Sequence, residues 1–228
     1  MCTIVLFTAL TLAAPVGADD TPEVRAAVAA LEKLGAKVSR HEMKPGKPIS
    51  EVHFPRTGCE ITDDDLKHLA PLTDVEWLLL LGQKKVTGDG LKHLTKLPNL
   101  KHIDFSKTPI TGENLAHLSG MKQLVRLGLW DTAVDDTGLA HLAELKELRY
   151  LFLTNAKIGD AGLKNLGAKP NLRDLRLGGT LVTDDALPII KKQFPKVGYI
   201  TAQGSKLTPA GAELGKKLGI MVDFTQRY

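Results

Sequence analysis

The stretch LVRLGLWDTAVDDTGLAHLAELKE (residues 124–147) decides how this chain folds, because similar stretches precede and follow it. Its first half follows the pattern LxxLxLxxT, and its second half is one version of the pattern (I/V)TDxGLxxL. The second pattern recurs at intervals of 24 or 25 residues, and a degenerate copy begins at Leu207. Its six clear copies span residues 61–69, 86–94, 110–118, 134–142, 158–166 and 182–190. Such regular spacing predicts a solenoid of stacked units.

Each half of the repeat has a structural interpretation. The LxL alternation predicts a short strand with one buried face, and the connection to the next strand is long enough for a crossover helix. A single repeat cannot bury both of its faces, so stability must come from stacked neighbours. We expect one residue of each repeat to cap the crossover helix that follows it. The expected caps are Thr62, Thr87, Thr111, Asp135, Thr183 and Thr208.

These repeats resemble the leucine-rich-repeat family, whose hallmark is LxxLxLxx followed by Asn, Cys or Thr. The resemblance covers about residues 49–219. It implies an α/β fold: a right-handed horseshoe solenoid with a parallel sheet on its concave face and short helices on its convex face. The 24-residue form is similar to bacterial repeats related to the cysteine-containing and ribonuclease-inhibitor-like subclasses, with Thr mostly at the ladder position.

The repeats divide the chain into four parts. Residues 1–18 lack charge and resemble a signal peptide, residues 19–48 form an N-terminal cap of a helix and a strand, residues 49–207 hold seven repeat strands, and residues 208–228 form a C-terminal cap. We expect a helix at 22–35 stopped by Gly35, an antiparallel hairpin into Ile49, and a last strand or cap at 220–224. With a functional signal peptide the protein is exported to the periplasm, the cell surface or the medium; otherwise it is cytoplasmic.

Composition excludes several classes of protein. The net charge of +4 is spread along the chain without a basic cluster, which argues against nucleic-acid binding. After signal removal no segment is long and apolar enough to span a membrane. Cleavage would also leave Cys59 as the only cysteine, which excludes an intramolecular disulfide and a cysteine-based zinc site. We expect a monomer without cofactors.

Two sets of titratable residues recur at fixed repeat positions. His68, His93, His117 and His141 share one position, followed by Asn165. Successive repeats lie too far apart for four imidazoles to share one zinc ion, so no metal site is predicted. The acidic runs 63–65, 135–136 and 184–185 fall in the first turn of the expected helices, where negative charge favours the helix dipole.

The concave face carries the candidate binding residues. Positions 3, 5 and 7 of the LxxLxLxx pattern point away from the core because strand side chains alternate. They hold both tryptophans of the chain and two of its three tyrosines, and Arg126 has His102 and Tyr150 as neighbours for a cation–π contact. The core does not need these aromatic residues. The candidate partner-binding residues are Trp77, Leu79, His102, Asp104, Arg126, Trp130, Asp131, Tyr150, Phe152, Arg176 and Tyr199.

The pattern favours a non-catalytic binding module for a protein partner, since Trp, Tyr and Arg are enriched at interface hot spots. Binding of a carbohydrate or cell-envelope polymer through the exposed aromatic residues is one alternative. An architectural, self-assembling repeat protein is another. An enzyme is not expected. His53, His102, Asp104 and Ser106 share the concave face, but the chain has no nucleophile elbow, phosphate-cradling loop or metal-ligand spacing.

Overall fold

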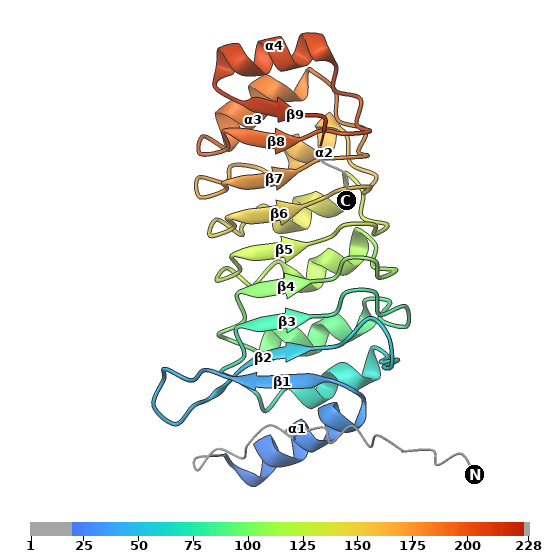
Figure 1. Cartoon of the computed structure of the whole chain (residues 1–228), viewed down its shortest axis with the longest axis vertical. Helices are drawn as coiled ribbons and strands as arrows, with labels where there is room; N and C mark the ends of the chain where they lie inside the picture. Colours follow the sequence, from blue (N-terminus) through green and yellow to red (C-terminus); the bar gives the residue numbers. More distant parts are fainter. Residues whose placement is uncertain (1–19, 226–228) are drawn as a thin grey trace, which may run out of the picture.

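The computed structural model describes residues 20–225, which form one sheet of nine strands whose spatial order follows the chain. Strand β1 pairs with β2 in the antiparallel direction, and all later pairs are parallel. Figure 1 shows the strands stacked from β1 to β9, with two open sheet edges. The strands are β1 (Lys37–Arg40), β2 (Ile49–His53), β3 (Trp77–Leu79), β4 (His102–Asp104), β5 (Arg126–Gly128), β6 (Tyr150–Phe152), β7 (Asp174–Arg176), β8 (Tyr199–Thr201) and β9 (Met221–Asp223).

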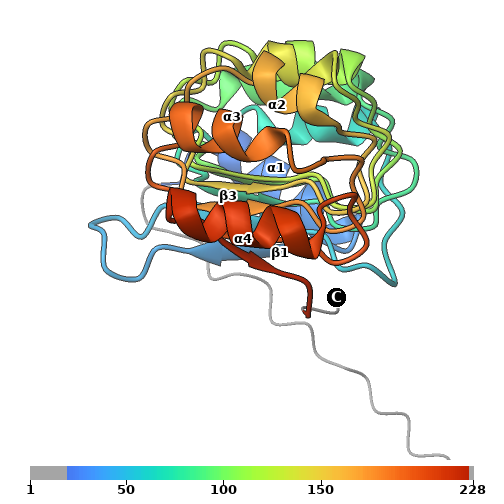
Figure 2. The same ribbon diagram turned by 90° about the horizontal axis from the view of Figure 1, so that it is seen from above.

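Short helices connect the parallel strands and cover one side of the sheet (Figure 2). The sequence predicts helical crossovers, but the first four are 3-10 helices rather than α-helices. A 3-10 helix rises about 2.0 Å per residue, compared with 1.5 Å in an α-helix, so it covers more distance with few residues. The helices are α1 (Pro22–Lys33), η1 (Asp64–Leu69), η2 (Asp89–Lys96), η3 (Glu113–Leu118), η4 (Gly138–Leu142), α2 (Asp160–Asn165), α3 (Ala186–Gln193) and α4 (Pro209–Leu218).

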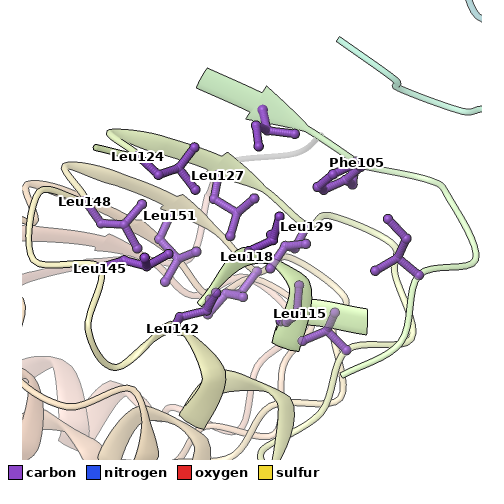
Figure 3. Close-up of a cluster of buried hydrophobic side chains, with 14 of the residues drawn as sticks. Phe105, Leu115, Leu118, Leu124, Leu127, Leu129, Leu142, Leu145, Leu148 and Leu151 are labelled. Carbon is purple, nitrogen blue, oxygen red and sulfur yellow. The ribbon is translucent and has the colours of Figure 1, made fainter. Parts of the chain in front are cut away.

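The core lies between the sheet and the helices and runs the length of the stack. Figure 3 shows part of it, where Leu127 of β5 and Leu151 of β6 lie on the same side as Leu118 of η3 and Leu142 of η4. Leu127, Leu139 and Leu151 are fully buried, and each fully buried leucine contributes about 2 kcal/mol. The α/β solenoid with a parallel sheet, predicted from the sequence, is confirmed.

The glycine of the repeat pattern allows the helices to stack closely. A Cβ atom on Gly138 would lie 2.3 Å from the Cα of Gly112 in the preceding repeat. Any larger side chain would force these two helical turns apart, which explains why the GL dipeptide recurs in this half of the repeat.

Helix capping differs from the sequence-based expectation. Thr208 caps α4 by accepting a hydrogen bond from the Gly211 N–H. Asp135 also serves its own helix as predicted, since it accepts a hydrogen bond from the Gly138 N–H at 2.9 Å. The hydroxyls of Thr62, Thr87 and Thr111 instead donate hydrogen bonds, and at several junctions an aspartate of the preceding repeat accepts the N–H groups. Asp63 accepts hydrogen bonds from the Thr87, Gly88 and Gly90 N–H groups at 3.0–3.1 Å. The prediction that these acidic residues serve their own helix is therefore wrong for Asp63. The same inter-repeat bond is made by Asp136 to Gly159 N–H, by Asp160 to Thr183 N–H and by Asp184 to Thr208 N–H.

The ends of the stack contain the expected elements. Helix α1 ends close to the predicted position, and Gly35 has a left-handed φ of 90°. The antiparallel hairpin of β1 and β2 and the last strand β9 are also present. Residues 1–18, the candidate signal peptide, lie outside the described residues. Within residues 20–225, no helix is long and apolar enough to cross a membrane.

Candidate partner-binding face

The face of the sheet that points away from the core, called here the outer face, carries the candidate residues. The register places His102, Arg126, Tyr150 and Asp174 next to one another on successive strands. The neighbours predicted for Arg126 are therefore confirmed. Tyr150 is 37% exposed, whereas Arg126 and His102 are half-buried.

Trp77 and His102 form a parallel stack on β3 and β4. Their ring centroids lie 3.6 Å apart with an interplanar angle of 12°. Burial of the imidazole, together with the charge of Arg126, lowers the pKa of His102 from 6.5 to about 4. The His102 ring is therefore neutral at physiological pH, so the stack carries no charge there.

Phe152 lies between two guanidinium groups. The Cζ of Arg126 lies 4.8 Å from the ring centroid, and the Cζ of Arg176 lies 4.3 Å from it. The sequence predicts a cation–π contact of Arg126 with His102 or Tyr150. The observed aromatic partner is instead Phe152, one strand away and two residues further along it, because the long arginine side chain reaches diagonally across the sheet.

Trp130 does not stand out into solvent as the strand alternation predicts. Strand β5 ends at Gly128, so Trp130 lies in the following turn, where the alternation no longer applies. The indole is half-buried and its Nε1 is shielded from solvent. Lys107 Nζ lies 4.2 Å from the ring centroid. The equivalent residues of the adjacent repeats, Ser106 and Thr154, are buried rather than exposed.

A polar ladder runs beside Trp130 through residues that share one repeat position. Lys107, Asp131 and Asn155 all have left-handed φ angles, of 61°, 54° and 58°. Asn155 donates its side-chain amide to the Asp131 carboxylate at 2.6 Å, and Lys107 Nζ lies 3.7 Å from the same carboxylate. Only Asp131 was a candidate from sequence. The missed signal is that the equivalent position in three other repeats is glycine: Gly82, Gly179 and Gly204, all with positive φ.

The other candidates lie on the same face. Leu79 is half-buried in β3. Asp104, also half-buried, accepts a hydrogen bond from the Ser106 N–H at 2.9 Å. Tyr199 donates its hydroxyl hydrogen bond to Asp223 of β9. The outer face thus brings all the candidate residues onto one continuous surface from β3 to β8 and the turns that follow these strands.

The remaining chemical groups considered from the sequence are the repeat histidines and Ser106. No group of three or more His, Cys, Asp or Glu side chains in this range has the geometry to hold a metal ion. His117 and His141 are exposed on the helical side. The buried Ser106 hydroxyl accepts a hydrogen bond from the Trp130 N–H at 3.3 Å.

Comparisons with known proteins place the fold. No protein-family model and no curated protein matches the chain. Internalin C2 of Listeria monocytogenes matches with a TM-score of 0.53 and 17% identity, over 90% of this chain and 93% of that one. A leucine-rich-repeat protein of Leptospira interrogans matches with a TM-score of 0.50 and 16% identity, over 69% of this chain and 45% of that one.

A third structure, the internalin inlF of Listeria monocytogenes, has a TM-score of 0.44 and 16% identity, over 74% of this chain. This chain spans 59% of the length of that structure. The likeness to internalin C2 and to the Leptospira interrogans protein, at 17% and 16% identity, establishes the fold alone, which is the one that the sequence repeats predict.

Proposed function

We propose that this leucine-rich-repeat chain is a non-catalytic binding module that engages a protein partner through its outer face. The observation that carries the proposal is the set of aromatic and arginine side chains gathered on this face without a role in the core. Trp, Tyr and Arg are the residue types that dominate the energy of protein interfaces. A repeat scaffold also supplies the extended surface that such an interface needs.

The state of the aromatic rings favours a protein over a glycan. Sugar recognition by stacking needs exposed ring faces, but His102 covers one face of Trp77, Lys107 lies over Trp130, and two arginines flank Phe152. Such pre-ordered side chains lose little entropy on binding a macromolecule of complementary shape. Glycan binding is therefore an outcome for the experiment to exclude.

The experiment is affinity capture with immobilised protein from an envelope extract of the source cells. The test variant is the double substitution Trp77→Ala/Tyr150→Ala on the outer face. The matched control is His117→Ala/His141→Ala, which removes two exposed rings from the helical side. We expect wild type and control to retain the same protein, and the outer-face variant to lose it at least tenfold while melting within a few degrees of wild type.

The result would contradict the proposal if the outer-face variant retained the same protein as wild type. Loss of capture on addition of envelope oligosaccharide would instead support the glycan alternative. Unchanged capture together with concentration-dependent assembly in sedimentation velocity would support an architectural role.

We also propose that residues 1–18 act as a signal peptide and that the mature protein works outside the cytoplasm. This rests on the uncharged, apolar composition of the segment and on the small residues that precede Asp19. Mass spectrometry of the N-terminus of the exported protein checks it, since cleavage should remove the whole segment.

A further inference from the structure

The centre of the outer face has an unusual arrangement of charge, with one aromatic ring held between two cations. Arg126 of β5 and Arg176 of β7 both contact Phe152 of β6 (strands labelled in Figure 1). Contact with the ring restricts the position of each guanidinium group, while its N–H donors stay available for a carboxylate. The site is therefore ordered before any ligand arrives.

The positive charge of Arg126 is not neutralised within the part of the chain that the structure describes. Lys107 is paired with Asp131, and Arg176 lies 3.4 Å from the Asp174 carboxylate. Arg126 forms no ion pair with a carboxylate of residues 20–225. The nearest candidate by register, Asp104, turns its Oδ1 toward the Ser106 N–H instead.

Gly128 explains this position of Asp104. A Cβ atom on Gly128 would lie 2.5 Å from Asp104 Oδ1, so the absent side chain leaves the space into which the carboxylate leans. A larger residue here would displace the Asp104 carboxylate. The glycine therefore helps to keep Asp104 away from Arg126, whose guanidinium stays over Phe152.

We propose that Arg126 and Arg176, held on either side of Phe152, bind a carboxylate side chain from an acidic segment of a protein partner. The inference rests on the proposed function and names the chemistry of its central contact. Tyr150, the exposed aromatic residue on the same strand as Phe152, supplies apolar contact area beside the two arginines.

The surrounding charges favour one discrete carboxylate over a continuous polyanion. Asp104, Asp131 and Asp174 all lie on the outer face or its adjoining turn, within one strand of the arginine pair in register. A nucleic acid or polyuronate chain crossing the sheet would meet these three like charges. A single acidic side chain flanked by apolar residues can contact the two arginines without bringing further negative charges near these aspartates.

The test uses fluorescence anisotropy with a capped octapeptide in which one central glutamate is flanked by leucine and glycine residues. The comparison probe has glutamine in place of that glutamate. At low salt we expect the glutamate peptide to bind wild type at least tenfold more tightly than the glutamine peptide, and to weaken as salt rises. Arg126→Gln and Arg176→Gln should each weaken binding at least tenfold.

Two further variants separate a specific site from a general charge effect. Arg25→Gln makes the same charge change on α1, at one end of the stack, and should bind the peptide like wild type. Arg126→Lys keeps the charge but loses the planar pair of donors, so it should bind more weakly than wild type. Circular dichroism of each variant checks that the fold is retained.

The proposal is overturned if the glutamine peptide binds as tightly as the glutamate peptide, if Arg126→Gln binds the glutamate peptide like wild type, or if no binding appears up to millimolar peptide. Tighter binding of a galacturonate hexamer, lost in the same arginine variants, would assign the site to an acidic glycan and overturn it as well. A captured partner that depends on Tyr150 but not on Arg126 would leave the proposed function standing and remove only this inference.

Discussion

Lys169 occupies a position at which the preceding repeats place Leu145, Met121 and Leu97. Its side chain is 0% exposed. The ammonium group donates hydrogen bonds to the carbonyls of Ala143 and Leu166, at 3.0 Å and 2.5 Å. These carbonyls belong to the residues that end η4 and α2. A positive charge at the C-termini of two helices interacts favourably with their dipoles. The lysine therefore links two repeats by hydrogen bonds at a position where the other repeats have an apolar side chain.

Burial lowers the pKa of Lys169 from 10.5 to about 8, and the nearby charge of Lys146 acts in the same direction. Between these two values the unfolded chain binds more protons than the folded chain, so this group makes the protein more stable as pH rises from 8 to 10.5. We expect its contribution to rise by on the order of 2 kcal/mol across that window. Urea unfolding at a series of pH values measures it.

Lys169→Met is the matched control, because methionine already occupies the equivalent position as Met121. At pH 7 this variant should stay within about 1 kcal/mol of wild type, since replacing a buried charge by an apolar group of similar size is often neutral. The difference between the two proteins should then change steadily with pH. Parallel stability curves from pH 7 to 10.5 would show that the lysine does not titrate in this range.

The sequence located the outer-face residues but not their contacts. The positions of Arg126 and Phe152 on the outer face were predictable, because side chains alternate along β5 and β6. Their stacking was not, since it depends on which way a long side chain leans. The predicted exposure of Trp130 was wrong for a different reason. Strand β5 has only three residues, so the alternation of its side chains does not continue as far as Trp130.

At the scale of elements, the aspartates of one repeat hold the beginning of the next helix. The Asp63 carboxylate accepts hydrogen bonds from the Thr87 hydroxyl and from the Thr87, Gly88 and Gly90 N–H groups. Although burial raises the pKa of Asp63, these hydrogen bonds outweigh it and lower the pKa below 3.8. The carboxylate therefore ties η1 to η2, and this stabilisation is present above the unfolded-state pKa and lost as pH falls through the folded-state value.

Asp63→Ala should destabilise the protein by about 2 kcal/mol at pH 7, as expected for loss of a strong helix cap. Asp64→Ala is the control, because Asp64 is exposed and pairs with Lys67 on its own helix, and it should change the melting temperature little. Thermal unfolding at pH 7 and at pH 3 compares them. Equal effects of the two substitutions at pH 7 would contradict the inter-repeat role of Asp63.

The strands and the crossover positions were predictable because the spacing of apolar residues that indicates them recurs in every repeat. The type of helix was not predictable, because 3-10 and α-helical turns bury the same residues at this length. The capping pattern was also missed for a physical reason. A contact between Asp63 and Gly88 depends on how two repeats stack, whereas the rule applied to the sequence considers one helix at a time.

At the scale of the whole molecule, a stack of repeats is stable only if its ends are covered. The sheet begins at β1, which pairs with β2 and contacts α1. It ends at β9, which packs against α4. Both outer strands are short. Arg40 of β1 pairs with Asp20, and Met221 of β9 is 66% exposed. Short and charged edge strands discourage pairing between molecules, and the monomer expected from the sequence stays a prediction for sedimentation velocity to test.

Removing α4 and β9 by truncation after Leu207 should therefore change both stability and association. The deletion removes Ile220, which is fully buried, and uncovers the edge of β8 and one side of α3. Losing several kcal/mol of apolar burial should lower Tm by roughly 10 °C or more. The unpaired β8 edge and the exposed end of the core should also cause dimers or larger species to form at micromolar concentration. Sedimentation velocity checks this against the intact chain, for which we expect a monomer. A truncated chain that stays monomeric with an unchanged Tm would mean that the preceding repeats are stable without α4 and β9.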